Sequence, residues 1–288
     1  MKNFLTVILR VRNENLFLES FVKHYFAEGV DEIYILDDNS TEPFPEYVVN
    51  HPNVFIYESN YFATQHEKLI DAQLLYDHIV KDKTEWMMFV DADEFITTRR
   101  NPEKTIRQEL ETTFRDVDHI KIPWIQFGSN GVDDNPEKVL LETTWRWNHD
   151  LKHPHPSNWL KGCCKYDKIE VKSIFRTSKF EQLVTHCPKG AIGEVKIVDG
   201  IDKILPYEDE EQIWYHNLRE ASIARAYLTC NHYRTVSKQQ MKQKADDSHL
   251  PLYRVDNCYE LQLQSDYSEI EDTVLKDKAI KRKYYENI

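Results

Sequence analysis

The sequence contains little glycine and little cysteine. Only seven glycines occur in 288 residues, and they form no Gly-rich loop around a nucleotide phosphate, which argues against the P-loop class. The five cysteines include no Cys-x-x-Cys pair, so their spacing supports neither a zinc site nor a disulfide framework. We therefore expect a reducing environment and a cytoplasmic location.

Long apolar runs are also missing, and none approaches the length of a membrane span. The short apolar run at the N-terminus is interrupted by Arg10 and Arg12, and no small-residue cleavage site follows it. We expect neither a signal peptide nor a transmembrane segment. Residues 276–283 are locally basic, which is typical of a solvated helix face; a peripheral membrane or partner contact is the alternative. The sequence leaves the oligomeric state open.

Basic residues are outnumbered, with 37 Lys and Arg against 49 Asp and Glu, a net charge of −12. A negative field repels phosphate backbones, so nucleic-acid binding is not expected, although a local basic pocket for a small phosphate ligand is compatible with it. Hydrophobic residues make up 41% of the chain, enough for a substantial core. The length suits one large α/β domain, alone or with a C-terminal extension.

The first third of the chain alternates between apolar β-type runs and amphipathic helical segments. Expected strands cover residues 4–11, 32–36, 54–57 and 86–90, and expected helices cover residues 16–28 and 63–82. This order is typical of a parallel sheet flanked by helices. The second half is less regular: we expect strands within 117–125, 139–147 and 162–186, and helices at 209–229 and 237–246. Residues 269–288 form a charged helix or a frayed tail.

Polar clusters follow three of the expected parallel strands, at residues 10–14, 37–40 and 91–94. The carboxyl ends of parallel strands lie at one edge of a sheet, and ligands of such sheets bind there. We therefore expect the three clusters to line one crevice.

The last of these clusters contains Asp91-Ala92-Asp93, directly after a hydrophobic strand. Two carboxylates at this spacing can reach one hard cation, which would bridge the two phosphates of a nucleotide sugar. A solvated acidic turn is the alternative. Asp38 is placed to contact a nucleotide base or ribose, or belongs to an Asx-rich turn. Arg10, Arg12 and Asn13 are candidates for the diphosphate, or are ordinary surface groups.

Further candidates lie in the second half. Trp124 and Phe127 offer aromatic faces for sugar stacking, and Gly128 would let a ligand approach the backbone; a core aromatic pair is the alternative. His232 is a candidate third ligand for a divalent cation, and a packed histidine is the alternative. Among the other histidines, His186 is the one further candidate for such a role, with the same alternative.

Six sequence pieces occur in an order that resembles the GT-A-fold glycosyltransferases of the family 2 and family 92 (DUF23-like) group. These pieces lie within residues 12–14, 36–40, 89–95, 124–128, 171–176 and 232–237, with Lys244 following, and the resemblance covers about residues 4–245. It implies an α/β GT-A fold with a mixed central sheet, a UDP-sugar donor more often than a GDP-sugar, and Mn²⁺ or Mg²⁺.

The resemblance also implies roles for residues at the matching positions. Asp38 would contact the base or ribose, Asp91 the ribose and metal, and Asp93 the metal directly. His232 would be a late histidine ligand. Lys172 and Arg176 would lie near the diphosphate or the acceptor.

Families of this kind usually invert the anomeric centre, which requires a general base for the acceptor hydroxyl. Glu142, Asp150 and the acidic stretch 208–211 are candidates, with Asp150 favoured. Glu94 would instead support Asp93 or a helix start.

The sequence thus predicts a metal-dependent, inverting glycosyltransferase that acts on a glycan acceptor. We expect a GT-A domain at 1–245, with a nucleotide-sugar-binding half at 1–98 and an acceptor-binding half at 99–245, followed by a helical C-terminal extension at 246–288. A nucleotidyltransferase or a nucleotide-sugar hydrolase is one alternative, although the former would normally carry a Gly-rich loop near its N-terminus. A non-catalytic glycan-binding module is the other.

Overall fold

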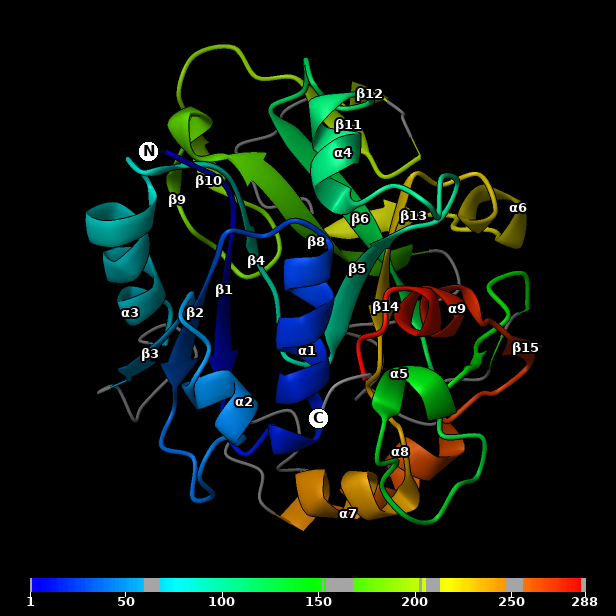
Figure 1. Cartoon of the computed structure of the whole chain (residues 1–288). Coiled ribbons are helices and arrows are strands. Elements are labelled where there is room, and N and C mark those ends of the chain that lie inside the picture. Colours follow the sequence, from blue (N-terminus) through cyan, green and yellow to red (C-terminus); the bar gives the residue numbers. More distant parts are fainter. Residues whose placement is uncertain are drawn as a thin grey trace.

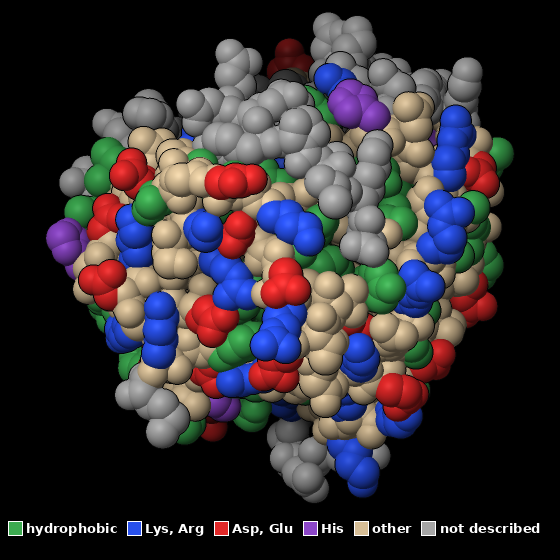
Figure 2. Space-filling view, turned by 90° about the horizontal axis from the view of Figure 1, so that it is seen from above, with side chains coloured by type: hydrophobic (Ala, Val, Ile, Leu, Met, Phe, Trp, Pro, Cys, Tyr) green, Lys and Arg blue, Asp and Glu red, His purple; other side chains and the backbone are tan. Residues whose placement is uncertain are grey.

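A central mixed sheet organises the computed structural model, which describes residues 2–59, 68–151, 153, 168–201, 204–205, 213–246 and 256–285. The strand order along its main path is β12-β11-β6-β8-β4-β1-β2-β3 (Figure 1). No helix in these ranges is long and apolar enough to cross a membrane. Seen from above, basic and acidic side chains are interspersed on the surface (Figure 2), so the net negative charge is not gathered in one area of this face.

The first half forms the parallel part of the sheet, as predicted. Its strands are β1 (Asn3–Val11), β2 (Glu32–Asp37), β3 (Val54–Glu58) and β4 (Thr84–Phe89), and β1 pairs in parallel with both β2 and β4. Its helices are α1 (Asn15–Ala27), α2 (Glu46–Val49) and α3 (Lys68–Leu75), which continues as a π-helical turn (Tyr76–Val80). The start of the predicted helix 63–82 lies outside the described residues.

The second half adds antiparallel pairing to the sheet. β8 (Lys168–Arg176) lies between β4 and β6 (His119–Gln126) and runs antiparallel to both. β11 (Ile197–Asp199) and β12 (Ile204–Leu205) extend the β6 edge. β14 (Leu228–His232) pairs in parallel with β6 and antiparallel with β5 (Glu94–Thr98), so it joins the strand after Asp93 to β6.

The remaining elements are short. They are α4 (Ile106–Glu111), α5 (Val139–Glu142), β7 (Trp145–Arg146), a 3₁₀ turn (Thr177–Lys179), β9 (Phe180–Gln182), β10 (Lys189–Ala191), β13 (Trp214–His216), α6 (Glu220–Ile223), α7 (Lys238–Asp246), α8 (Cys258–Gln264), β15 (Ile270–Glu271) and α9 (Val274–Lys281). The predicted helix at 237–246 is confirmed by α7.

Two predicted elements are wrong. The helix expected at 209–229 is replaced by β13, the short α6 and the start of β14. All five residues of β14 are buried although Thr229, Asn231 and His232 are polar, and a run of only five residues gives a weak strand signal in a sequence. The strand expected at 139–147 is instead the helix α5 followed by the two-residue strand β7, which pairs with β15.

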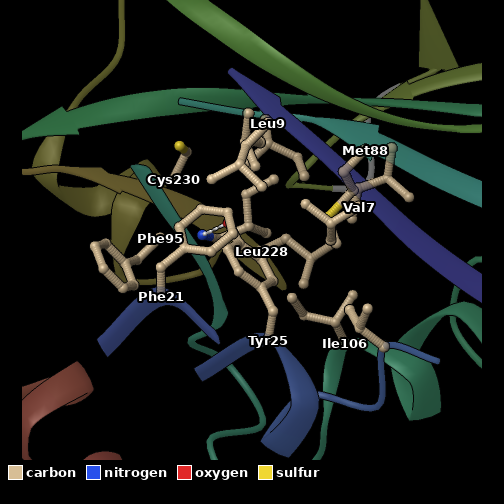
Figure 3. Close-up of a cluster of buried hydrophobic side chains, with 14 of the residues drawn as sticks. Val7, Leu9, Phe21, Tyr25, Met88, Phe95, Ile106, Leu228 and Cys230 are labelled. Carbon is tan, nitrogen blue, oxygen red and sulfur yellow. Dashed lines mark hydrogen bonds between the residues drawn. The ribbon is translucent and has the colours of Figure 1, made fainter. Parts of the chain in front are cut away.

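Helix α1 covers one face of the sheet, and its apolar residues make the centre of the core. Phe21 and Tyr25 of α1 pack with Phe95 of β5, beside Val7 and Leu9 of β1 (Figure 3). The Tyr25 hydroxyl also donates to the Glu94 carbonyl oxygen at 2.9 Å. This packing fixes the chain where it leaves β4 and turns into β5. Of the five cysteines, Cys187, Cys230 and Cys258 are buried free thiols, and the other two lie outside the described residues.

The C-terminal segment packs onto the main sheet domain. Lys278 of α9 lies 2.6 Å from the buried carboxylate of Glu28, and Arg282 lies 2.8 Å from it. Helix α9 lies beside α5 in Figure 1. The basic residues of 276–283 therefore include two that neutralise a buried acid rather than face solvent. The domain boundary at 245 stays a prediction.

Candidate active site

The carboxyl ends of β1 and β2 meet at one edge of the sheet, as the strand pattern predicts. Val11 pairs with Asp37 in the parallel register. Beyond it, Nε of Arg10 lies 3.5 Å from a carboxylate oxygen of Asp38, and Arg12 donates to the Asp38 carbonyl oxygen at 3.2 Å. Arg10 also donates to Ser59 Oγ at 2.8 Å, just after β3. Three predicted donor-site residues are thus in contact.

Asn13 connects the same two loops. It has a φ of +55°, a left-handed conformation that asparagine adopts more readily than most residues. Its backbone N–H donates to Ser40 Oγ at 3.1 Å, and its side-chain oxygen accepts from the backbone N–H of Thr41 at 2.8 Å. Asn13 therefore has a structural role at the crevice predicted for the diphosphate.

Asp91 lies at the end of β4, next to Lys172 of β8. The Lys172 ammonium lies 2.9 Å from Asp91 Oδ2 and 3.1 Å from Glu94 Oε2. The lysine side chain is 1% exposed, whereas that of Asp91 is 49% exposed. Burial opposes the charged form of Lys172, but the two carboxylates raise its pKa. Glu94 also accepts the Asp91 backbone N–H at 2.7 Å, so it supports Asp91 rather than Asp93.

Asp93 is the buried carboxylate of the pair. Its Oδ2 lies 3.0 Å from the Lys244 ammonium, and its Oδ1 lies 3.7 Å from Nε2 of His232. Burial favours the neutral acid, but Lys244 and His232 together lower the pKa of Asp93. Burial lowers the pKa of His232 to about 3, so this imidazole is neutral at physiological pH. Its Nδ1 lies 3.1 Å from the Gln126 side-chain amide.

The pairing of β14 explains why His232 reaches Asp93. His232 is the last residue of β14, and it lies opposite Glu94 in β5 and Gln126 in β6. The backbone N–H of Tyr233 donates to the Asp93 carbonyl oxygen at 2.8 Å. The end of a strand 139 positions after Asp93 in the sequence is thereby held beside Asp93, and the role of His232 as a metal ligand stays a prediction.

Glu14, at the start of α1, belongs to the same electrostatic group. Burial raises the pKa of Glu14 to about 7; Lys244 lowers it, and Asp93 and Asp91 raise it further. The loop after β1 is thus coupled to the loop after β4.

Only two of the three predicted metal ligands, Asp93 and His232, lie next to each other. Within the described ranges, no three His, Cys, Asp or Glu side chains lie closely enough to hold a metal ion. Asp93 and His232 face each other, while Asp91 contacts Lys172. The donor types suit a divalent cation, because carboxylate oxygens and a neutral imidazole nitrogen are ligands of Mn²⁺ and Mg²⁺.

The three predicted acceptor-site residues pack mainly against other residues of the protein. The Trp124 ring is 5% exposed and lies between His232 and His186, with centroid distances of 4.3 and 5.6 Å. Phe127 is 1% exposed and stacks on Tyr233.

A Cβ at Gly128 would lie 2.7 Å from both the Tyr267 carbonyl oxygen and Ser268 Oγ. The close approach at this glycine is therefore made by the C-terminal segment. Sugar stacking by Trp124 and Phe127 stays a prediction.

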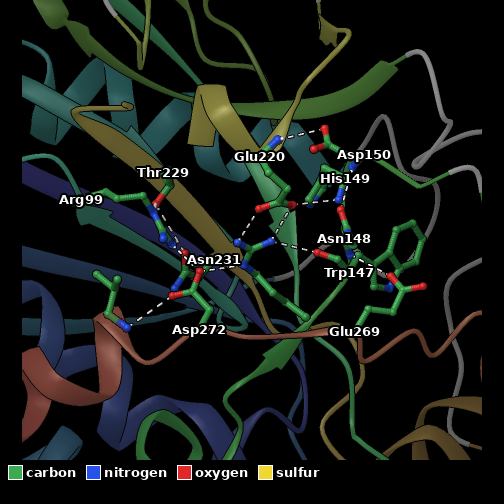
Figure 4. A network of polar contacts seen from close by, with 12 residues as sticks. Arg99, Trp147, Asn148, His149, Asp150, Glu220, Thr229, Asn231, Glu269 and Asp272 are labelled. Atoms are coloured by element: carbon green, nitrogen blue, oxygen red, sulfur yellow. Dashed lines mark hydrogen bonds and ion pairs between the residues drawn. The ribbon is translucent and has the colours of Figure 1, made fainter. Parts of the chain in front are cut away.

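Three other predicted residues lie away from this group. Arg176 pairs with Trp86 in the register of β8 and β4, contacts Glu85, and lies at the opposite end of β4 from Asp91. Glu142 accepts the backbone N–H of Lys138 at the start of its own helix. Asp150 accepts the backbone N–H of Glu220 at 3.3 Å, within the polar network of Figure 4. The structure brings none of these three to Asp91 or Asp93 through a contact of the described residues. The acidic stretch 208–211 lies outside them.

Sequence reasoning missed three supporting residues of this group, which are Gln126, Lys244 and Glu14. Lys244 follows the last of the six sequence pieces, but the sequence assigned it no role. Nothing in the local sequence of α7 indicates a contact with Asp93. Gln126 and Glu14 lie within the motif pieces 124–128 and 12–14, and this position is the signal that could have selected them.

Comparison with known proteins agrees with the resemblance seen in the sequence. The family model described as glycosyltransferase family 92 matches residues 13–282. No curated protein matches the chain.

Two solved structures illustrate the likeness. The mannosyltransferase PcManGT from Pyrobaculum calidifontis, in complex with GDP-Man and Mn²⁺, is 18% identical, with a TM-score of 0.29 over 42% of this chain and 36% of that one. Glucosyl-3-phosphoglycerate synthase from Mycobacterium tuberculosis, with Mn²⁺, UDP and glucosyl-3-phosphoglycerate, is 13% identical, with a TM-score of 0.33 over 62% of this chain and 58% of that one. The chain thus spans about a third and somewhat over half of these proteins, and such low scores carry no argument about its site.

The family match covers nearly the whole chain, and the strand topology is the mixed α/β sheet expected of a GT-A fold. This protein belongs to glycosyltransferase family 92.

Proposed function

We propose that this protein transfers a sugar from a nucleotide-diphosphate donor, with a UDP-sugar favoured, to a hydroxyl group of a glycan acceptor. The observation that carries the proposal is that Asp91, paired with Lys172, and Asp93, paired with Lys244 and facing His232, directly follow one buried strand of the parallel sheet. This group combines metal-ligand chemistry with two ammonium groups that suit a diphosphate.

The nucleotide would lie over the ends of β1 and β2. Asp38 is held there by Arg10 and Arg12, and its carboxylate would contact the ribose or base. Arg10 and Arg12 flank Val11 in the sequence, and both contact Asp38. Their guanidinium groups would attract the diphosphate of a donor bound at this loop. Lys172 would neutralise the charge that develops on the leaving diphosphate as the glycosidic bond breaks.

Asp91, Asp93 and His232 would hold Mn²⁺ or Mg²⁺, which supplies Lewis-acid stabilisation of the diphosphate when it is bound. Gln126 would orient the His232 ring through Nδ1. For Nε2 of the neutral His232 ring to keep its lone pair for the cation, Nδ1 would carry the proton and the Gln126 side-chain amide would turn its oxygen toward Nδ1 to accept it. Lys244 would keep Asp93 ionised both with and without donor. Transfer in one displacement would invert the anomeric centre.

The test is a panel of UDP- and GDP-sugars incubated with the native protein and with Asp93→Ala, in Mn²⁺ and in chelator. Metal-dependent release of a nucleoside diphosphate from one donor, lost in Asp93→Ala, supports the proposal and names the sugar. A glycan array with that donor then separates a transferase from a hydrolase. Metal-dependent donor binding without turnover on any acceptor would favour a binding module. An absence of nucleotide binding would contradict the proposal.

A further inference from the structure

His186 lies in the segment after β9, and its ring is held in one orientation. Nδ1 lies 2.9 Å from the carbonyl oxygen of Val171 in β8. A carbonyl oxygen only accepts hydrogen bonds, so Nδ1 carries the proton and donates it. Nε2 of the neutral ring therefore presents a lone pair. Burial and the charge of Lys172 lower the pKa of His186 to about 4, which keeps the ring neutral at physiological pH.

Glu170 of β8 faces this lone pair. Its Oε2 lies 3.9 Å from Nε2 of His186, which is too long for a direct hydrogen bond. A hydroxyl group has one proton to donate, and the lone pair of Nε2 is the acceptor that can take it. The carboxylate would then stabilise the imidazolium that results. The His186 side chain is 17% exposed, so the ring is accessible at one edge.

His186 borders the predicted donor site on the acceptor side. The Lys172 ammonium donates both to Asp91 Oδ2, at 2.9 Å, and to the carbonyl oxygen of Thr185, at 3.3 Å. One buried ammonium thus joins Asp91 to the residue before His186. Trp124 makes a second connection, because its ring contacts His186 on one side and His232 on the other.

The backbone keeps the segment in place. Ser173 Oγ donates to the His186 carbonyl oxygen at 2.6 Å. Glu170 and Lys172 are two residues apart in a strand, so their side chains lie on the same face of β8. The carboxylate that faces His186 and the ammonium that contacts Asp91 therefore point to the same side of the sheet.

We propose that His186 is the general base of the transfer, with Glu170 beside it as a positioning residue; this inference rests on the proposed function. The acceptor oxygen forms a bond to C1 of the donor sugar while its proton moves to Nε2 of His186. The bond between C1 and the diphosphate oxygen breaks, and its electron pair leaves with the diphosphate. The imidazolium, next to Glu170, then returns its proton to solvent.

The test measures donor turnover, with water or a glycan as acceptor, in His186→Ala and His186→Gln. We expect kcat to fall by about 10²-fold or more, the usual contribution of a general base, with little change in the donor KM. Added imidazole should restore part of the turnover of His186→Ala. A purely structural role would give no such rescue. Glu170→Gln should lower kcat by a smaller factor.

His51→Ala is the matched control, because His51 stacks on Phe26 at the surface of α1; its turnover should equal that of the native protein, with no effect of imidazole. Should His186→Ala misfold, His186→Gln keeps a side chain that can donate to the Val171 carbonyl but has no basic nitrogen. Native-like kcat in a folded His186 variant would overturn the proposal, as would a loss confined to Asp150→Asn or Glu142→Gln. If the native protein turns over no donor, the proposed function itself fails.

Discussion

The ammonium group of Lys244 lies 3.0 Å from Oδ2 of Asp93, although the two residues are 151 positions apart. Both side chains are largely buried, with 16% and 11% exposed. The pair holds α7 against the loop between β4 and β5, and it keeps a carboxylate ionised in a place where burial alone would favour the neutral acid.

Replacing Lys244 by alanine should therefore destabilise the protein at pH 7. Removal of one partner leaves a buried carboxylate without its counter-charge, which costs about 3 kcal/mol. Urea unfolding of the native and variant proteins would measure the difference. Lys238→Ala is the control, because Lys238 lies in the same helix but pairs with the exposed Asp133; it should unfold like the native protein. Equal stability of Lys244→Ala and Lys238→Ala would contradict the expectation.

Gln126→Leu should weaken metal binding without removing a ligand. The amide of Gln126 contacts Nδ1 of His232 at 3.1 Å, and loss of such a partner typically lowers metal affinity 10- to about 100-fold. Titration of Mn²⁺ into protein saturated with UDP, followed by calorimetry, would measure the change. Gln108→Leu, at the exposed start of α4, should leave the affinity unchanged. Native affinity in Gln126→Leu would remove His232 from the ligand set.

Asp272→Asn should destabilise the protein in a pH-dependent way. Asp272 lies 2.8 Å from Arg99 and 2.7 Å from Arg146, and all three side chains are buried (Figure 4). Burial opposes the charged form of Asp272, but the two arginines lower its pKa. Its stabilising contribution is therefore present above the unfolded-state pKa of about 3.9 and is lost as the pH falls through the lower folded-state value.

We expect Asp272→Asn to lower the free energy of unfolding by about 3 kcal/mol at pH 7. The difference in this free energy between variant and native protein should shrink as the pH falls below about 4. Urea unfolding at several pH values would follow this trend. Asp133→Asn, at an exposed surface pair, should show no comparable pH dependence. A difference that stays constant down to low pH would mean that the lost stability does not come from the ionised carboxylate.

Gly128→Ala should destabilise the fold by about 2 kcal/mol, because the added methyl group would meet the backbone carbonyl oxygen of Tyr267 and the short side chains of Asp266 and Ser268. Thermal and urea unfolding would measure this loss. Gly131→Ala is a useful comparison: a Cβ there meets nothing within 4 Å, but φ is +75°, so only backbone strain of about 1 kcal/mol applies. Unchanged stability of Gly128→Ala with impaired acceptor use would instead support the ligand-approach role expected from the sequence.

The parallel half of the sheet and its crevice could be predicted from the sequence, since each strand and its following polar residues form a local pattern. The contact of Arg10 and Arg12 with Asp38 follows from this pattern, because neighbouring parallel strands bring their carboxyl ends together. The strand that carries His232 was missed, because its first two residues were assigned to the expected helix 209–229 and its five residues are too few for a clear strand pattern.

Residue type and order alone determined the family, the strand-end crevice and the choice of Asp91 and Asp93 as its acidic centre. Only the tertiary structure decided which basic side chains pair with these carboxylates, since Lys172 of β8 contacts Asp91 and Lys244 of α7 contacts Asp93. It also decided that Trp124 is enclosed and that Gly128 receives the C-terminal segment. A sequence pattern records which side chains lie along one element, whereas burial and ion pairing depend on contacts between elements far apart in the chain.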